Sequence, residues 1–128
     1  QDRLKMISRW QSSINLGIPI PGGSDCPIES GNPLFEFYAA VTRQNHQGMP
    51  KQGWQPQEKI SKTNALQMFT SWAAYGGFDE YRRGKIDINY DADFTILSHN
   101  LLETDNSQIL DTKIIATIVN GQFVYSEL

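Results

Sequence analysis

The chain has 128 residues and a mass of 14.5 kDa, which suits one domain and is too small for a complete eight-stranded β/α barrel of about 250 residues. Hydrophobic residues make up 39% and charged residues 20%, so the composition indicates a folded protein with its own core. The net charge is −3, and the longest basic cluster is only Arg82, Arg83 and Lys85. Nucleic acid and anionic membranes are therefore excluded as expected partners.

Cysteine content and hydropathy further narrow the class of protein to which this chain can belong. Cys26 is the single cysteine, so the chain forms no internal disulfide, and we expect a buried, unreactive thiol. No apolar run approaches the roughly 18 residues of a membrane span. The chain starts at Gln1 and enters a helical pattern at once, without a signal peptide, which leads us to expect a piece of a longer protein.

Residues 4–17 show the spacing of an amphipathic helix. Apolar side chains recur three or four positions apart, at Leu4, Ile7, Trp10 and Ile14. Gly17 is typical of a helix end. The short apolar stretch 18–24 then predicts a strand that leads into a glycine-rich turn, although Pro19 and Pro21 lack the N–H that a central strand donates.

Two more helices are predicted in the first half of the chain. Asn32-Pro33 is typical of a helix start, and this helix ends before the polar loop 44–57. Ser61 caps a third predicted helix, which Gly76-Gly77 ends. Its apolar face consists of Ala65, Leu66, Phe69 and Ala73.

From Gly84 onward the hydrophobic period changes to two, which is typical of strands. The alternating or apolar runs are Ile86 with Ile88, residues 94–97, residues 114–119 and residues 123–125. Asn120-Gly121 predicts a two-residue type I′ hairpin turn between the last two runs. We therefore expect an α/β chain whose architecture changes near residues 82–84.

Asp25 is the residue whose setting invites a catalytic interpretation. It follows the predicted strand and three small residues, Gly22, Gly23 and Ser24. A carboxylate at the end of a strand can bind a metal ion or take a proton from water. From spacing alone, however, a purely structural turn is the more common role of this composition.

For the other chemically capable residues the sequence predicts structural roles. His46 and His99 each stand alone, so neither belongs to a metal-binding histidine pair, and both are expected in exposed loops. Ser24-Asp25 lacks the pattern of a nucleophile elbow. Asp91 and Asp93 supply too few oxygens for a calcium loop and indicate a solvated turn.

Several segments carry a family resemblance. The run GIPIPGGSDCP at 17–27, followed by Asn32-Pro33-Leu34 and by AAVTR at 39–43, resembles the carboxyl-terminal part of the amidohydrolase superfamily. More narrowly it is similar to the third amidohydrolase family, metal-dependent hydrolases that include N-substituted formamide deformylases. Further matching segments are Ala65-Leu66, 84–86, 92–97 and 117–125, so the resemblance covers nearly the whole chain.

The resemblance implies a fold and a site. The fold class would be α/β: residues 1–82 form the carboxyl-terminal fragment of a (β/α)8 TIM barrel, with 18–24 as its eighth strand, and residues 83–128 form strands of a small β-sandwich. Asp25 would be both a metal ligand and the catalytic base that accepts a proton from the attacking water. Arg43 matches a recurring family position, and we assign it a structural role.

The implied activity is hydrolysis of a non-peptide C–N bond in a small amide-type substrate. The implied cofactor is a divalent metal ion, with zinc as the first candidate. Its histidine ligands would lie on barrel strands that this chain lacks. One carboxylate does not hold a catalytic metal tightly, so the fragment alone is expected to be inactive. The alternative is a non-catalytic binding or regulatory module that keeps this fold.

A fragment cut from a barrel exposes apolar faces. We expect Leu4, Ile7 and Phe37 to lie on such faces and a homo-oligomer to cover them.

Overall fold

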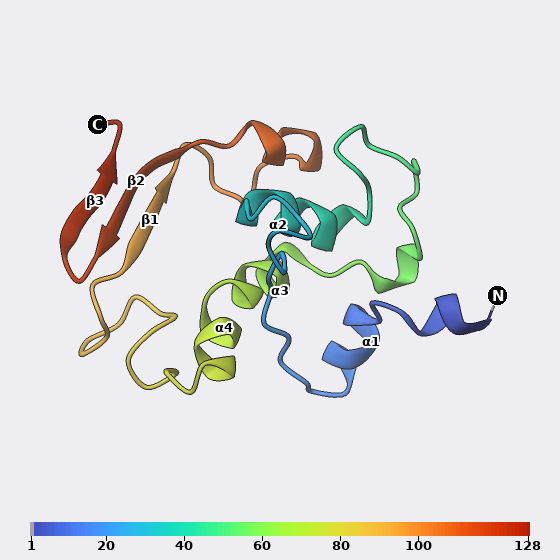
Figure 1. Ribbon diagram of the computed structural model, residues 1–128, viewed down its shortest axis with the longest axis horizontal. Coiled ribbons are helices and arrows are strands. Elements are labelled where there is room, and N and C mark those ends of the chain that lie inside the picture. The colour runs from blue at the N-terminus through green and yellow to red at the C-terminus, as the bar shows by residue number, and fades with distance from the viewer. Residues whose placement is uncertain (1) are drawn as a thin grey trace.

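Helices occupy the first part of the chain and strands the last (Figure 1). The computed structural model describes residues 2–128. Its α-helices are α1 (Trp10–Asn15), α2 (Pro33–Thr42), α3 (Lys62–Met68) and α4 (Ser71–Gly76), and its strands are β1 (Phe94–Leu97), β2 (Ile114–Val119) and β3 (Gln122–Ser126). Short 3₁₀ turns are η1 (Asp2–Met6), η2 (Pro56–Glu58) and η3 (Asn106–Asp111). Within 2–128, every helix is too short or too polar to cross a membrane.

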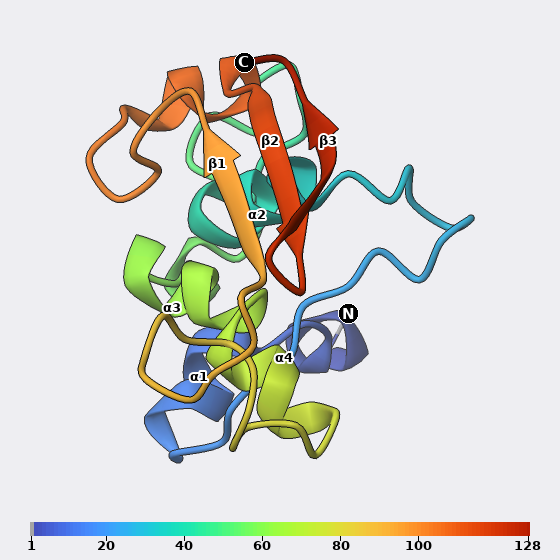
Figure 2. The same cartoon turned by 90° about the vertical axis from the view of Figure 1, so that its left-hand side faces the viewer.

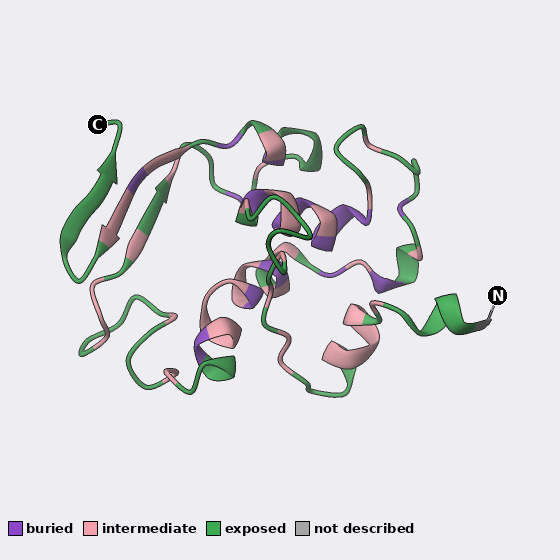
Figure 3. Cartoon of the chain, in the orientation of Figure 1, coloured by how far each residue is buried: buried purple, intermediate pink, exposed green. Residues whose placement is uncertain are grey.

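Helix α2 is the centre of the core, and its predicted start is confirmed. Asn32 Oδ1 accepts a hydrogen bond from the Leu34 N–H at 3.0 Å, and Pro33 occupies the first helical position. Phe37 is only 2% exposed, so the expectation that it lies on an open face is wrong. It is buried because α3 and η3 pack against α2, as the purple residues of Figure 3 show. The buried core consists of Leu34, Phe37, Tyr38, Ala40, Val41, Ile60, Ala65, Met68, Leu101 and Ile109.

The third predicted helix is split into α3 and α4. Its cap is confirmed, since Ser61 Oγ accepts from the Asn64 N–H at 3.1 Å. The break follows Met68, whose carbonyl accepts a hydrogen bond from the Gly22 N–H at 2.8 Å, a donor outside the helix. Thr70 has φ −129° and ψ −102°, outside the helical region, so α4 begins anew at Ser71.

The first predicted helix is also interrupted. Ser8 has a positive φ of 52° and separates η1 from α1, whereas Gly17, with φ 77°, ends the helical segment as predicted. Residues 18–24 form no strand, which corrects the expectation, because the one sheet within 2–128 contains only β1, β2 and β3. The segment runs beside α4 and leads toward α2 (Figures 1 and 2).

The three strands form an antiparallel sheet in the order β1-β2-β3. The predicted hairpin turn is confirmed, since Asn120 and Gly121 have φ of 51° and 75°. The strand expected at Ile86 and Ile88 is wrong: both side chains are more than 80% exposed, and a turn closed by the Tyr90 N–H and the Asp87 carbonyl bends the segment. The molecule is therefore an α/β chain with a small antiparallel sheet.

Candidate functional site

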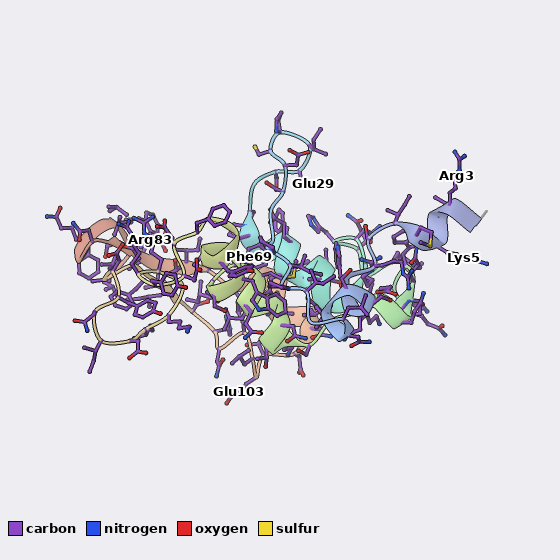
Figure 4. The ribbon with its side chains drawn as sticks, turned by 90° about the horizontal axis from the view of Figure 1, so that it is seen from below. Arg3, Lys5, Glu29, Phe69, Arg83 and Glu103 are labelled. Carbon is purple, nitrogen blue, oxygen red and sulfur yellow. The ribbon has the colours of Figure 1, made fainter. Side chains whose placement is uncertain are left out.

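Asp25 lies in a loop, residues 22–31, that stands away from the body of the molecule. Figure 4 shows Glu29 on this loop, far from the helices. Two backbone hydrogen bonds close its tip: the Ile28 N–H donates to the Asp25 carbonyl at 2.9 Å, and the Glu29 N–H donates to the Ser24 carbonyl at 3.2 Å. Asp25 itself has φ 50°, a left-handed conformation.

The base of the loop packs closely on α3. A Cβ atom built on Gly22 would lie 2.7 Å from Cε1 of Phe69, so any other residue would require the Phe69 ring to move. The Gly22 N–H also bonds the Met68 carbonyl. The small residues before Asp25 thus let the chain approach α3, while the rest of the loop extends outward.

The carboxylate of Asp25 is exposed and has no hydrogen-bond or ion-pair partner among residues 2–128. The turn is held by its backbone, so the side chain is not used to cap the following segment. Cys26 is exposed as well, which overturns the expected buried thiol, because the loop leaves the body before reaching it. Burial raises the pKa of the Glu36 carboxyl, a hydrogen bond with Ser24 lowers it, and the negative charge of Glu29 raises it.

The histidines do not join Asp25. Both are exposed, as expected. The His46 ring lies 4.2 Å from the Phe35 ring, and His99 Nδ1 lies 2.9 Å from Ser98 Oγ. Across residues 2–128 there is no group of three His, Cys, Asp or Glu side chains that could hold a metal ion. Asp25 can therefore offer one carboxylate, and the described residues form no complete site around it.

Arg43 has the structural role that we expected. It is 7% exposed, its Nε donates to the Trp54 carbonyl at 3.1 Å, and its guanidinium lies between the Trp10 and Trp54 rings, 4.4 and 5.0 Å from their centroids. Burial lowers the pKa of Arg43, and the negative charge of Glu58 opposes this shift.

Glu58 is an anchor that the sequence did not predict. Its carboxylate accepts from the Ser12 N–H at 2.9 Å and from the Ser12 hydroxyl at 2.6 Å, so it caps the first turn of α1 from 46 positions away. These hydrogen bonds hold the pKa of Glu58 below its ordinary value, with the charges of Arg9 and Arg43 acting in the same direction against burial. No local spacing predicts a contact between such distant residues.

An ionic cluster joins the end of α4 to the start of β1. Arg83 Nε lies 2.9 Å from Asp91 Oδ2 and 3.8 Å from Asp93 Oδ2, and Asp79 pairs with both Arg82 and Arg83. Asp91 and Asp93 thus form an ion-paired turn. The cluster ties the helical part of the chain to the sheet.

Comparison with known proteins places this geometry in context. A family model described as amidohydrolase family matches residues 1–125. The chain is 35% identical over 127 residues to the putative amidohydrolase YtcJ of Bacillus subtilis (strain 168), covering 99% of this chain and 24% of that protein. It is 35% identical over 119 residues to the protein LONG AFTER FAR-RED 3 of Arabidopsis thaliana, covering 91% and 19%.

A third relative is the N-substituted formamide deformylase of Arthrobacter pascens, 23% identical over 125 residues that cover 98% of this chain and 22% of the deformylase. No solved structure matches the chain significantly. The chain spans a quarter or less of the length of these curated relatives.

Proposed function

Because the chain belongs to the amidohydrolase family, we propose that it is the carboxyl-terminal part of a hydrolase that cleaves a C–N bond of a small amide-type molecule. A relative named N-substituted formamide deformylase supports this class of bond. The observation that carries the proposal is the exposed Asp25 carboxylate, presented on a projecting loop without any partner in residues 2–128.

We further propose that residues 1–82 belong to a TIM barrel and residues 83–128 to a small β-sandwich. The exposure of every residue of β3 supports a further layer over the sheet.

The residues of this chain could contribute a ligand to a metal site, but they could not form such a site alone. A carboxylate oxygen is a ligand that zinc accepts, but catalytic zinc sites use three protein ligands, and residues 2–128 supply no such group. Asp25 would hold the metal from one side, with the other ligands outside this chain. The divalent metal, with zinc as the first candidate, would lower the pKa of a water molecule bound to it.

Asp25 has two tasks in this proposal. Its carboxylate takes the proton of the water whose oxygen forms the new bond to the amide carbon. As the C–N bond breaks, the same group passes that proton to the leaving amine. Support comes from the turn at residues 24–29, which is closed by backbone hydrogen bonds and leaves the exposed Asp25 carboxylate free for this transfer.

The test uses the full-length protein and a panel of N-substituted formamides and other amides, with amine release as the measurement. We expect Asp25→Asn to lower kcat by about 10²–10⁴-fold, the usual contribution of a general base. Glu29→Gln, the same charge change in the same loop, serves as control and leaves kcat close to wild type. A wild-type kcat in Asp25→Asn would refute the assignment.

The 128-residue chain by itself is expected to hold no stoichiometric metal and to show no amidase turnover. Metal analysis and an activity assay measure both, and tight metal with turnover would contradict the expectation. A full-length protein that hydrolyses none of the amides would instead favour the alternative, a binding or regulatory module.

We also propose that the protein forms a homo-oligomer. Leu4 and Ile7 are 57% and 49% exposed on the amino-terminal segment, and association would cover them. Sedimentation of the full-length protein tests this, and a monomer at high concentration would contradict it.

A further inference from the structure

A hollow of about 390 Å³ lies between the amino-terminal segment and α4. Ile14 and Ile18 line one side, Trp72 and Tyr75 line the other, and Glu80 brings a carboxylate to it. Figures 1 and 2 both show α1 and α4 on the same side of the molecule, and Figure 1 shows the chain after α1 passing between them. The lining is therefore mainly apolar and aromatic, and its polar side chains are Ser71 and Glu80.

The Glu80 side chain is partly buried, and one of its carboxylate oxygens lacks a partner. Its Oε2 is buried and has no hydrogen-bond partner within residues 2–128. The nearest arginines in sequence, Arg82 and Arg83, pair with Asp79 and Asp91 instead. The Tyr90 hydroxyl donates to the Glu80 carbonyl at 3.0 Å and thereby fixes the backbone beneath this side chain. A buried acceptor without a donor is destabilising, which favours an occupant that supplies a donor.

We propose that this hollow is the docking site for a segment of the same polypeptide outside residues 1–128, which inserts an apolar stem and pairs a lysine or arginine with Glu80. The inference rests on the proposed function only in that the chain is part of a longer protein. The chain spans at most 24% of the curated relatives reported above, so most of such a protein lies outside it.

Exposure around the hollow supports an occupant. Ile18 and Tyr75 remain 51% and 55% exposed although they line it. Leu16 and Phe78, close in sequence to these residues, are 79% and 90% exposed. Several exposed apolar side chains near one hollow usually mark an interface.

Charge argues against a second copy as the occupant. In a two-fold dimer the same patch meets itself, so an interface centred on the hollow would bring two Glu80 carboxylates together. No lysine or arginine is among the described residues that line the hollow. The cation must come from a different surface.

The first test is the melting temperature of the full-length protein carrying Glu80→Gln. If Glu80 pairs with a cation, the variant leaves that cation without its partner, and we expect Tm to fall by at least about 2 °C. Glu103→Gln, at an exposed site on the other side of the molecule from the 22–31 loop in Figure 4, is the matched control and leaves Tm unchanged. An unchanged or raised Tm in Glu80→Gln would overturn the proposal, since removing a carboxylate that has no cationic partner does not destabilise the fold.

The second test is hydroxyl-radical footprinting of Tyr75 in the wild-type full-length protein at two concentrations. Protection that does not change on dilution supports an occupant from the same polypeptide. Protection lost on dilution indicates a second copy and overturns the proposal, as does a reactivity equal to that of the denatured chain. Neither measurement depends on amide hydrolysis. A failure of the proposed docking can therefore be distinguished from a failure of the proposed activity.

Discussion

Helix α2 and strand β3 place the same residue type in opposite surroundings. Phe37 on α2 is 2% exposed, whereas Phe123 on β3 is 60% exposed. Helix α2 is covered by α3 and η3 of the same chain, while β3 pairs only with β2, and all five of its residues are exposed. The difference shows that this chain encloses one core by itself and leaves its rim, including β3 and the 22–31 loop, open to further contacts.

The contrast between α2 and β3 is tested most directly by truncating Phe37 and Phe123. We expect Phe37→Ala to lower the free energy of unfolding of the 128-residue chain by about 3–5 kcal/mol, because it leaves a cavity in the core. Phe123→Ala is the matched variant and should cost under about 1 kcal/mol, since little burial is lost. Urea unfolding measures both, and equal losses would contradict the contrast.

A second contrast lies within the loop 44–57. A Cβ atom at Gly53, which has φ 81°, would lie 2.3 Å from the Thr42 carbonyl oxygen, whereas one at Gly48, with φ 73°, would meet nothing within 4 Å. Gly53→Ala should therefore cost about 3 kcal/mol, and Gly48→Ala only the backbone strain of about 1–2 kcal/mol. Urea unfolding of the two variants tests this, and a Gly53→Ala protein as stable as Gly48→Ala would refute the close contact.

Glu58 predicts a pH dependence. Its folded pKa lies below the ordinary 4.5, so the native state binds fewer protons than the unfolded state and stability falls as pH drops below 4.5. Glu58→Gln should lose about 1–2 kcal/mol at pH 7 through its hydrogen bonds to Ser12, and this deficit should shrink below pH 4.5. Unfolding curves across pH measure it, with Glu103→Gln as control. A deficit that stays constant from pH 7 to acid would contradict the linkage.

The smallest effect is expected at the exposed ionic cluster. Arg83→Ala removes ion pairs with Asp79, Asp91 and Asp93, and the loss of stability should be visible only at low ionic strength. Thermal unfolding with and without about 0.5 M salt measures it, because a Debye length of a few Å screens such pairs. A loss that persists in high salt would show that Arg83 acts through packing.

Features set by neighbouring residues were predictable. The caps at Asn32 and Ser61 and the turn at Asn120-Gly121 depend on contacts over two or three positions, and all three are confirmed. Strands need partners, so the apolar runs at 18–24 and at Ile86 and Ile88 were wrongly predicted as strands. Their patterns resemble strands, but no described neighbour is present to pair with them.

The candidate site was predictable only in part. Asp25 could be named from its turn and its family resemblance, and its catalytic role stays a prediction. The contacts of Glu58 with Ser12 and of Arg43 with Trp10 span dozens of positions, and they arise from packing that no local pattern encodes. The break between α3 and α4 has the same origin, since its donor, Gly22, is remote in sequence.

The bond from Glu58 to Ser12 has an evolutionary consequence. Helix α1 leads directly into the segment that carries Asp25, so the end of the 44–57 loop determines where that segment departs. Homologues should accept insertions and deletions in the middle of this loop, yet conserve its junction with η2, where an acidic side chain must stay within reach of a hydroxyl in the first helical turn. Drift at that junction would shift the loop that carries Asp25 without altering any residue near it.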